Sequence, residues 1–491
     1  MDKVQILLSQ RQKLCKSAFK LLVLMLPIME ALGRNQALRK EEHLSIKKYH
    51  IRDRGEHMRI ALSSYTGVGA WFVLRLLAEG HEVDYYLSKS EYDEVLSGII
   101  PSPKMLSIDH RRTLKGFGYA SYKGYDLSIF DLTGKAKQAD SSRSDCPTFG
   151  DGSFECLLED DREAGLSFME KCEIKTPPYQ RFDKSSEAKS FVRKQDKRYV
   201  FKPFTPSGST QDTSTTYVSK DAEDMIKNLD NLCADAKGAP FVLQEYIKGT
   251  ELSVEAWFNG TDFFNITCDL EEKKFMNDKK GPNTGCAGNL IFAIHEDMHI
   301  YKDTLLKAKS ALQAVGFKGV IDVNSIVTEG RVYSLEWGPR FGYLCCPVFA
   351  NMYGSGFGEF LHAIASGRTP NVKWSASFGA AITISIPPYP TEIRIPKAKD
   401  IPIEGIDPED IEELLDYYLY DVKLNGKGLI TSGNYGFVGA PIGIGDSITE
   451  AFIKCERLLE RVQIPNIQYR TDIEKVCTEK FYTLEKDGWF S

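Results

Sequence analysis

The stretch Ser334-Leu335-Glu336-Trp337-Gly338-Pro339-Arg340-Phe341-Gly342 decides the fold of this chain. It has the pattern of a strand that delivers first a carboxylate, Glu336, and then a guanidinium, Arg340, to one place. A carboxylate can hold Mg²⁺, and an arginine can neutralise a phosphoryl group in transfer. Gly338 stands where a second metal ligand is expected, so the function depends on how that gap is filled.

The deciding strand forms a hairpin with the strand before it. The segment 320–327 is followed by Thr328-Glu329-Gly330 and then by 331–337. A three-residue loop with glycine in third place suits a type I turn closed by a left-handed residue, and it pairs Val327 with Arg331.

This register predicts which polar side chains share a face. Asp322 lies opposite Glu336, and Asn324 lies opposite Ser334. Two facing carboxylates repel each other unless a cation lies between them. We therefore expect Asp322 and Glu336 to bind a metal ion, with Asn324 as a reserve ligand. The alternative is two separately solvated acids.

Composition sets the outer limits. A chain of 491 residues is too long for one hydrophobic core, so two to four domains are expected. The formal net charge of −6 gives no electrostatic case for a nucleic-acid partner. The 11 cysteines lack the spacing of metal fingers, which favours reduced thiols and a cytoplasmic location.

The first 57 residues differ from the rest. The apolar stretch 21–26 follows three lysines, is too short to span a bilayer and is followed by Glu30. A signal peptide is one interpretation. An accessory extension, or an upstream start before Met58, is the interpretation we favour, and no membrane association is expected.

An α/β pattern begins at Met58. A strand, a small-residue turn and a helix occupy 59–79 in the order of a nucleotide-binding βαβ unit. The turn contains Gly67 and Gly69, and a glycine turn at a helix N-terminus can hold a phosphate through backbone N–H groups. The same glycines are also ordinary turn residues, so both interpretations stay open.

A second unit contains a lid-like pattern. A β segment ends at Lys202 and is followed by the polar loop 205–214, which is either a phosphate-covering lid or a surface loop. The strand 241–246 then runs through a short linker toward Glu251. Backbone groups of such a linker can read an adenine edge, and a carboxylate one turn later can take ribose hydroxyls.

Together these motifs resemble phosphoribosylamine–glycine ligase (glycinamide ribonucleotide synthetase), a family of the ATP-grasp superfamily. The resemblance covers residues 58 to about 480. The segments that carry it are 242–253, 281–285, 335–342, 429–433, 445–448 and 469–473.

The resemblance implies an α/β (α+β) chain with the ATP-grasp fold. A Rossmann-like pre-ATP-grasp domain is expected at 58–156, an ATP-grasp domain at 157–378 with a lid subdomain at about 177–248, and a small C-terminal α/β domain at 379–491. Residues 1–57 form the extension.

It also implies an activity. ATP phosphorylates a carboxylate to an acyl phosphate, and an amine displaces the phosphate to form an amide, as in purine biosynthesis. The expected cofactors are ATP and Mg²⁺ or Mn²⁺. The expected partners are an amino acid such as glycine and an amine acceptor, bound by a monomer or a homodimer.

The resemblance assigns roles to individual residues. Lys202 and Arg340 are expected to be catalytic. ATP is expected to contact Lys202, Gln244, Glu245, Tyr246, Ile247 and Glu251. The substrate is expected at a loop formed by Asn283, Thr284 and Gly285, and at Gly67 and Gly69. The metal is expected at Glu336, Asp322 and Asn324.

The chain departs from the family pattern at several places. Residues 65–71 replace a Gly-Gly-Arg-Glu-His type turn, Tyr343-Leu344-Cys345 replaces Asp-Pro-Glu, and Gly338 replaces an asparagine metal ligand. Three hypotheses follow: the purine-pathway ligase, a ligase that uses another amine acceptor, and an ATP-binding protein without enzymatic activity.

Overall fold

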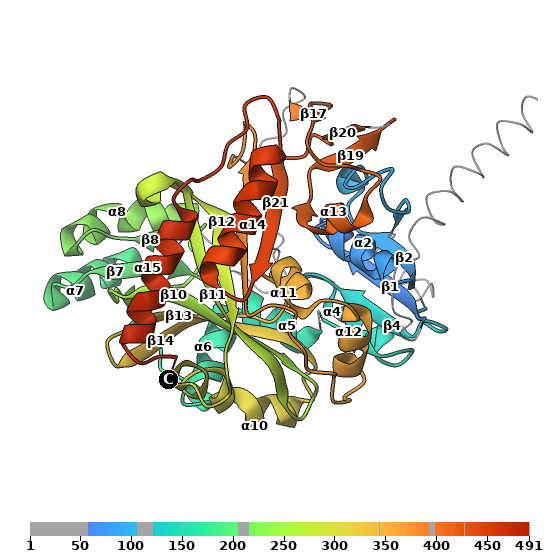
Figure 1. Ribbon diagram of the computed structural model, residues 1–491. Helices are drawn as coiled ribbons and strands as arrows, with labels where there is room; N and C mark the ends of the chain where they lie inside the picture. The colour runs from blue at the N-terminus through green and yellow to red at the C-terminus, as the bar shows by residue number, and fades with distance from the viewer. Residues whose placement is uncertain are drawn as a thin grey trace, which may run out of the picture. The chain divides into compact units, whose positions relative to one another are not determined.

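A computed structural model describes residues 57–105, 121–150, 152–204, 216–342, 344–391, 398–426 and 428–490. The extension expected at 1–57 (apart from His57) and the polar loop 205–214 lie outside the described residues. The described part is a mixed α/β structure whose strands form four sheets (Figure 1). No helix in these ranges is long and apolar enough to cross a membrane.

The first sheet is parallel and has five strands in the order β3-β2-β1-β4-β5. Five residues of β1 in succession are buried, as expected for a strand covered on both faces. The predicted strand–turn–helix over 59–79 is therefore present. The elements are β1 (Arg59–Ser64), α2 (Ala70–Ala78), β2 (Glu82–Leu87), η1 (Ser90–Tyr92), β3 (Lys104–Met105), β4 (Leu127–Phe130), α4 (Ala136–Ser142) and β5 (Thr148–Phe149).

Two helices, α5 (Ser153–Asp160) and α6 (Arg162–Lys171), lead to an antiparallel sheet with the order β6-β9-β7-β8. This sheet buries a hydrophobic core of its own together with the helices α7 and α8. They fall within the lid subdomain predicted at 177–248. The elements are β6 (Tyr179–Phe182), α7 (Ser185–Gln195), β7 (Tyr199–Pro203), β8 (Tyr217–Val218), α8 (Ala222–Asp235) and β9 (Phe241–Glu245).

The largest sheet has nine strands in the order β14-β13-β10-β11-β12-β15-β21-β16, with β18 also paired to β21. It continues across the boundary predicted at 378–379, and the domain division itself stays a prediction. The strands are β10 (Thr250–Phe258), β11 (Phe263–Met276), β12 (Lys280–Ala293), β13 (Gly319–Thr328), β14 (Arg331–Gly338), β15 (Phe378–Ile382), β16 (Ile384–Ser385), β18 (Tyr417–Leu419) and β21 (Phe437–Gly445).

Helices α14 and α15 lie along this sheet, α14 against β15 and β21, and α15 against β11 and β12 (Figure 1). A small sheet, β17-β20-β19, lies in the C-terminal part. The remaining elements are η2 (Asn277–Lys279), α9 (His299–Lys302), α10 (Leu305–Val315), α11 (Cys345–Tyr353), α12 (Phe357–Ala365), β17 (Pro402–Ile403), α13 (Ile411–Leu415), β19 (Val422–Asn425), β20 (Gly428–Thr431), α14 (Ile448–Arg461) and α15 (Ile473–Lys486).

Phe341, in the deciding stretch, joins the first sheet to the largest one. Its ring lies 4.8 Å from that of Phe72 in α2, 5.1 Å from that of Phe149 in β5 and 6.0 Å from that of Trp257 in β10. Trp257 and Phe149 are almost completely buried. Because aromatic side chains bury large apolar areas, this cluster fixes the segment after Gly338 against two sheets and so sets the position of Arg340.

The predicted hairpin exists, but its predicted register is wrong. The turn has two residues, Glu329 and Gly330, so Thr328 pairs with Arg331. One extra residue on β14 then forms a bulge between the pairs Ser325–Ser334 and Asn324–Glu336. As a result Asn324, not Asp322, lies opposite Glu336, and Asp322 lies opposite Gly338.

Candidate active site

Strands β10, β11, β13 and β14 place polar side chains around one pocket. Ser253 of β10 pairs with Asp269 on one side and with Asn324 on the other, and Asn324 pairs with Glu336. In the next row, Glu255 pairs with Asp322, and Asp322 with Gly338. The pocket has a volume of about 210 Å³, and its charged lining is Glu255, Asp269, Glu271, Lys273, Asp322, Glu336 and Arg340.

Glu336 is a carboxylate surrounded by the positive charges of this pocket. Burial alone would raise its pKa, but Lys202, Lys273 and Arg162 together hold the pKa below its ordinary value. The Arg162 guanidinium lies 3.8 Å from Glu336 Oε2, and the Glu336 side chain is 50% exposed. Glu336 is therefore an ionised carboxylate that faces the pocket among cations.

Lys202 reaches the same place from β7. The residue is only 6% exposed, and burial lowers its pKa to about 8 although Glu336 favours the charged form. An anion bound beside Lys202 would raise this pKa again, because an opposite charge favours the ionised form. Lys202 and Glu336 are therefore close enough for each to favour the charged form of the other.

Arg340 is held by a carboxylate that the sequence did not indicate. Its Nε donates to Glu159 Oε1 of α5 at 3.1 Å, and the carboxylate raises the pKa of Arg340. This hydrogen bond and one from Nη1 to Phe341 O at 3.4 Å fix the guanidinium, and Arg340 lines the pocket. No local sequence pattern indicates Glu159, because it lies 181 residues from Arg340.

The gap at Gly338 is filled from the neighbouring strand. A Cβ added at Gly338 would overlap Asp322 Oδ1, and Asp322 Cγ would lie only 2.8 Å from it. The Asp322 carboxylate therefore occupies the space that a side chain at 338 would take. Burial raises the pKa of Asp322 to about 7, with Arg340 acting in the opposite direction.

Asn324 links the predicted ATP contacts to the predicted metal ligands. Its Nδ2 donates to Glu251 Oε1 at 3.1 Å, and its buried Oδ1 has no hydrogen-bond partner among the described residues. Glu251 is also 3.1 Å from Lys273 Nζ, which lies 3.4 Å from Glu271. Burial opposes the charge of Lys273, but Glu271 and Glu251 raise its pKa.

The linker predicted to read adenine follows β9. The N–H of Glu245 donates to Pro178 O at 2.8 Å, and that of Tyr246 donates to Arg198 O at 3.0 Å. Both donors are engaged, which leaves Ile247 as the next residue able to offer one. Gln244 is buried at the end of β9.

The predicted substrate loop is a strand. Asn283, Thr284 and Gly285 belong to β12, and Thr284 Oγ1 donates to Lys273 O at 2.9 Å across β11. The resemblance implied a loop here, but pairing with β11 extends the strand through these residues. Of the three residues, Gly285 lines the pocket.

The glycine turn at Gly67 and Gly69 does not line this pocket, and a carboxylate lies against it. The Ser64 hydroxyl donates to Asp131 Oδ2 at 2.5 Å, and a Cβ built on Gly69 would lie 2.6 Å from the same oxygen. Asp131 is 1% exposed, and burial raises its pKa to about 6. Gly67 N–H is engaged by Ser64 Oγ at 2.9 Å.

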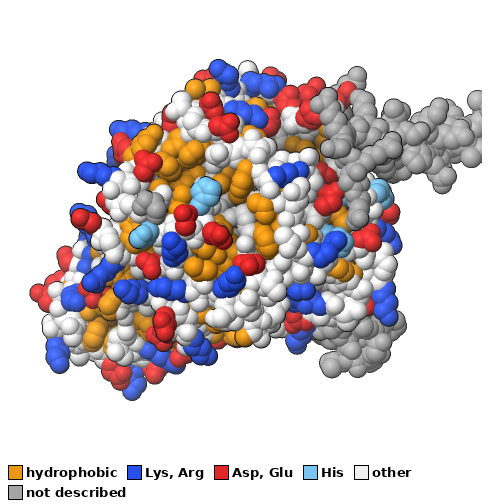
Figure 2. Space-filling model, turned by 60° about the horizontal axis from the view of Figure 1, so that its bottom comes forward, with side chains coloured by type: hydrophobic (Ala, Val, Ile, Leu, Met, Phe, Trp, Pro, Cys, Tyr) orange, Lys and Arg blue, Asp and Glu red, His pale blue; other side chains and the backbone are white. Residues whose placement is uncertain are grey.

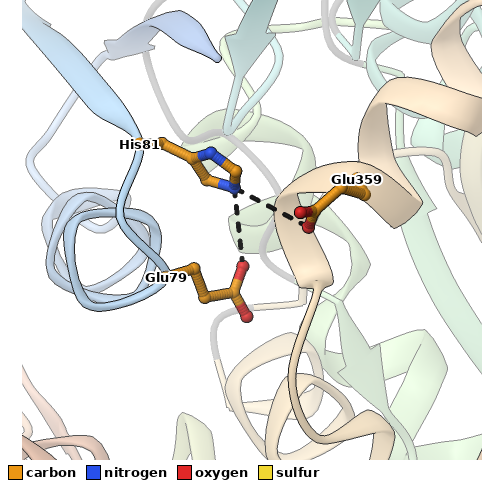
Figure 3. A group of neighbouring side chains, drawn as sticks. All are labelled: Glu79, His81 and Glu359. Carbon is orange, nitrogen blue, oxygen red and sulfur yellow. Dashed lines mark ion pairs between the residues drawn. The ribbon is translucent and has the colours of Figure 1, made fainter. Parts of the chain in front are cut away.

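A second group of possible metal ligands lies elsewhere: Glu79, His81 and Glu359 (Figure 3). His81 Nε2 lies 3.9 Å from Glu79 and 3.8 Å from Glu359. However, His81 Nδ1 accepts the N–H of Met58 at 3.4 Å, which leaves the proton of a neutral ring on Nε2.

Glu79 already has its own partners. Its two oxygens accept the N–H groups of Gly356, Phe357 and Gly358 at 2.9–3.1 Å, at the start of α12. A carboxylate at a helix N-terminus is a favourable cap. The group in Figure 3 therefore has a structural role, because it joins the end of α2 and the start of β2 to α12. Local sequence patterns could not indicate this contact, because the residues lie almost 280 positions apart.

The fold defines the class of protein. Residues 163–346 match the family described as "Phosphoribosylglycinamide synthetase, ATP-grasp (A) domain". The solved biotin carboxylase domain of 2-oxoglutarate carboxylase from Hydrogenobacter thermophilus, in complex with MgADP, covers 89% of this chain and 97% of its own, with a TM-score of 0.58 and 14% identity. The chain has the ATP-grasp fold.

Within that class the resemblance is narrower. The phosphoribosylamine–glycine ligase of Neisseria meningitidis serogroup B is 25% identical over 338 residues, which are 66% of this chain and 77% of the relative. The solved phosphoribosylamine–glycine ligase of Thermotoga maritima covers 84% of this chain and 99% of its own, with a TM-score of 0.63 and 20% identity. The chain resembles phosphoribosylamine–glycine ligase, as its motifs indicated.

Proposed function

We propose that this protein is an ATP-dependent carboxylate–amine ligase that forms an amide through an acyl phosphate, with the reaction of phosphoribosylamine–glycine ligase in purine biosynthesis. The observation that carries the proposal is the placement of Glu336 among Lys202, Lys273 and Arg162 at a pocket that Arg340 also lines. This arrangement suits a polyphosphate whose terminal group is transferred.

Each residue has a separate task. Lys202 binds phosphate oxygens, and the linker 244–247 positions the adenine, with Glu251 near the ribose. Arg340, fixed by Glu159, stabilises charge on the phosphoryl group as it moves to the amino-acid carboxylate. The amine then attacks the acyl carbon, the amide bond forms, and phosphate leaves with the electrons of the broken C–O bond.

Mg²⁺ fits the donor set of this pocket. Glu336 and Asp322 offer carboxylate oxygens, and Asn324 offers a buried amide oxygen without a partner among the described residues. Mg²⁺ prefers oxygen ligands of these kinds, and when bound it screens the charge of the phosphates. These three residues are the ligands we propose.

The test is ADP release with MgATP, glycine and phosphoribosylamine, each also left out in turn. We expect ADP only when both glycine and an amine are present. Glu336→Gln should abolish release, and Glu329→Gln, in the exposed turn of the same hairpin, should leave it unchanged. No ADP with any amine would refute the ligase assignment.

One observation favours a second candidate, a ligase that joins an amino acid to another amine. Asp131 lies against the turn where the family pattern has a phosphoribosyl-binding segment. A phosphate at this turn would approach a carboxylate, which repels it when ionised. ADP release with glycine and a non-phosphorylated amine, but not with phosphoribosylamine, would select this candidate.

A further inference from the structure

Two acidic residues of the pocket, Glu255 and Asp269, have no part in the phosphate transfer proposed above. Glu255 is 2% and Asp269 is 6% exposed, and both line the pocket. Glu255 Oε1 and Asp269 Oδ1 are buried and have no hydrogen-bond partner among the described residues. A buried carboxylate oxygen without a donor is costly, so each needs one when the site is filled.

The cations of the pocket are already engaged elsewhere. Lys273 pairs with Glu251 and Glu271, and Arg340 pairs with Glu159. Neither Glu255 nor Asp269 forms an ion pair with any residue in the described ranges. The two orphan oxygens therefore lack a donor from the described residues, and a cation from outside the chain is the donor that would favour the ionised form of both carboxyl groups.

Glu255 lies next to the position where the family pattern has a glutamate from another part of the chain. Where the family pattern continues Arg-Phe-Gly with Asp-Pro-Glu, this chain has Cys345 in place of the glutamate. Cys345 Sγ lies 3.5 Å from Glu255 Oε2. A carboxylate thus stands beside position 345, but it is supplied by β10 instead of α11. Asp322 relates to Gly338 in the same way.

We propose that Glu255 and Asp269 form a seat for the ammonium group of a ligase substrate. This seat rests on the proposed function, and it adds the substrate chemistry: a primary ammonium next to the group to be activated or attacked. An ammonium group has three N–H donors and no acceptor, which suits two carboxyl oxygens that both lack a donor. The ammonium belongs either to the amino-acid donor or to the amine acceptor.

The test compares probes that differ by the ammonium. Glycine and acetate are titrated by calorimetry in the presence of a non-hydrolysable ATP analogue, and ¹³C-methylamine is titrated by NMR without nucleotide. We expect glycine to bind the wild type at least 10-fold more tightly than acetate. Glu255→Gln and Asp269→Asn should each weaken the ammonium probe by about 10- to 100-fold and leave acetate unchanged.

The glycine and methylamine titrations distinguish the amino-acid donor from the amine acceptor as the source of the ammonium. Loss of glycine affinity with methylamine unchanged assigns the seat to the donor, and loss of methylamine affinity assigns it to the acceptor. If neither probe weakens in the two variants, the seat is refuted. Failure of the ATP analogue to bind would overturn the proposed function instead, because the methylamine arm needs no nucleotide.

A rescue variant guards against misfolding. Glu255→Gln combined with Cys345→Glu returns a carboxylate to the position of the family pattern, and it should recover ammonium affinity to within about threefold. Glu155→Gln is the matched control, because Glu155 is a buried acid outside the pocket, paired with Arg143 at 2.8 Å. An equal loss of affinity in Glu155→Gln would overturn the proposal.

Discussion

The relation between Asp322 and Gly338 allows a direct exchange experiment. In this chain the carboxylate of Asp322 fills the space of a side chain at 338. Asp322→Ala empties that space and removes a proposed metal ligand. We expect the Mg²⁺ concentration for half-maximal ADP release to rise about 100-fold, which corresponds to about 2.7 kcal/mol. Glu336→Ala should have an effect of the same size.

The substitution Gly338→Asn is opposed by steric overlap and not by the backbone conformation. The φ angle of Gly338 lies outside the left-handed range, so a side chain is allowed there. All three carboxylate atoms of Asp322 lie within 3.2 Å of the position of its Cβ. Gly338→Asn should therefore destabilise the protein by about 1–3 kcal/mol, as overpacking does elsewhere. Urea denaturation measures this loss.

A double variant tests whether Asp322 takes the place of a metal ligand at position 338. Asp322→Ala with Gly338→Asn removes the overlap and restores the asparagine of the family pattern. Stability should return to within about 0.5 kcal/mol of Asp322→Ala, and the Mg²⁺ requirement should fall back at least 10-fold, a coupling that only neighbouring sites show. Glu329→Gln, in the exposed turn of the hairpin, is the control and should change neither quantity. Additive effects of the two substitutions would refute the reasoning.

Three further predictions concern other parts of the structure. Burial raises the folded-state pKa of Asp131 from 3.8 to about 6, so the contribution of Asp131 to stability falls as pH rises from about 4 to 6. The unfolding free energy of Asp131→Asn relative to wild type should therefore grow by about 2 kcal/mol between pH 4 and 7 in urea titrations, and a constant difference would contradict this. Glu79→Gln weakens the cap of α12 and should lower the unfolding free energy by about 1 kcal/mol, more at low salt than at high salt. Arg340→Lys loses the planar guanidinium that Glu159 holds in place, so kcat should fall about 100-fold while the Kd for ATP stays within threefold. A change confined to the Kd for ATP would assign Arg340 to ground-state binding of the nucleotide.

Much of the fold follows from local patterns in the sequence. The βαβ unit at 59–87 and the strand that ends at Lys202 rest on periodicity and turn chemistry, which act over a few residues. The hairpin register was missed because the turn is one residue shorter than expected and β14 carries one extra residue. The shorter turn and the extra residue together shift the register by two residues. Asp322 and Glu336 therefore still face the same side of the sheet, but they belong to neighbouring pairs on that side, Asp322–Gly338 and Asn324–Glu336.

The rest of the site depends on contacts that no local pattern encodes. Glu159 reaches Arg340 across 181 residues, and Glu255 meets Cys345 across 90. These carboxylates come from a helix and a strand whose own sequences indicate only secondary structure. The role of Glu255 becomes visible when the sheet order places β10 beside β13, and β13 beside β14.

The two departures from the family pattern, at 338 and 345, acquire a common explanation in three dimensions. Glu255, Asp322 and Gly338 are successive partners across β10, β13 and β14. The Asp322 carboxylate fills the space of a side chain at 338, and the Glu255 carboxylate, the next residue in this row, lies beside Cys345. Oxygen ligands act through position and charge, whichever strand carries them, so the chemistry of the pocket can persist while the motif changes. For this reason we expect the paired exchanges at 322/338 and 255/345 to restore function where the single substitutions remove it.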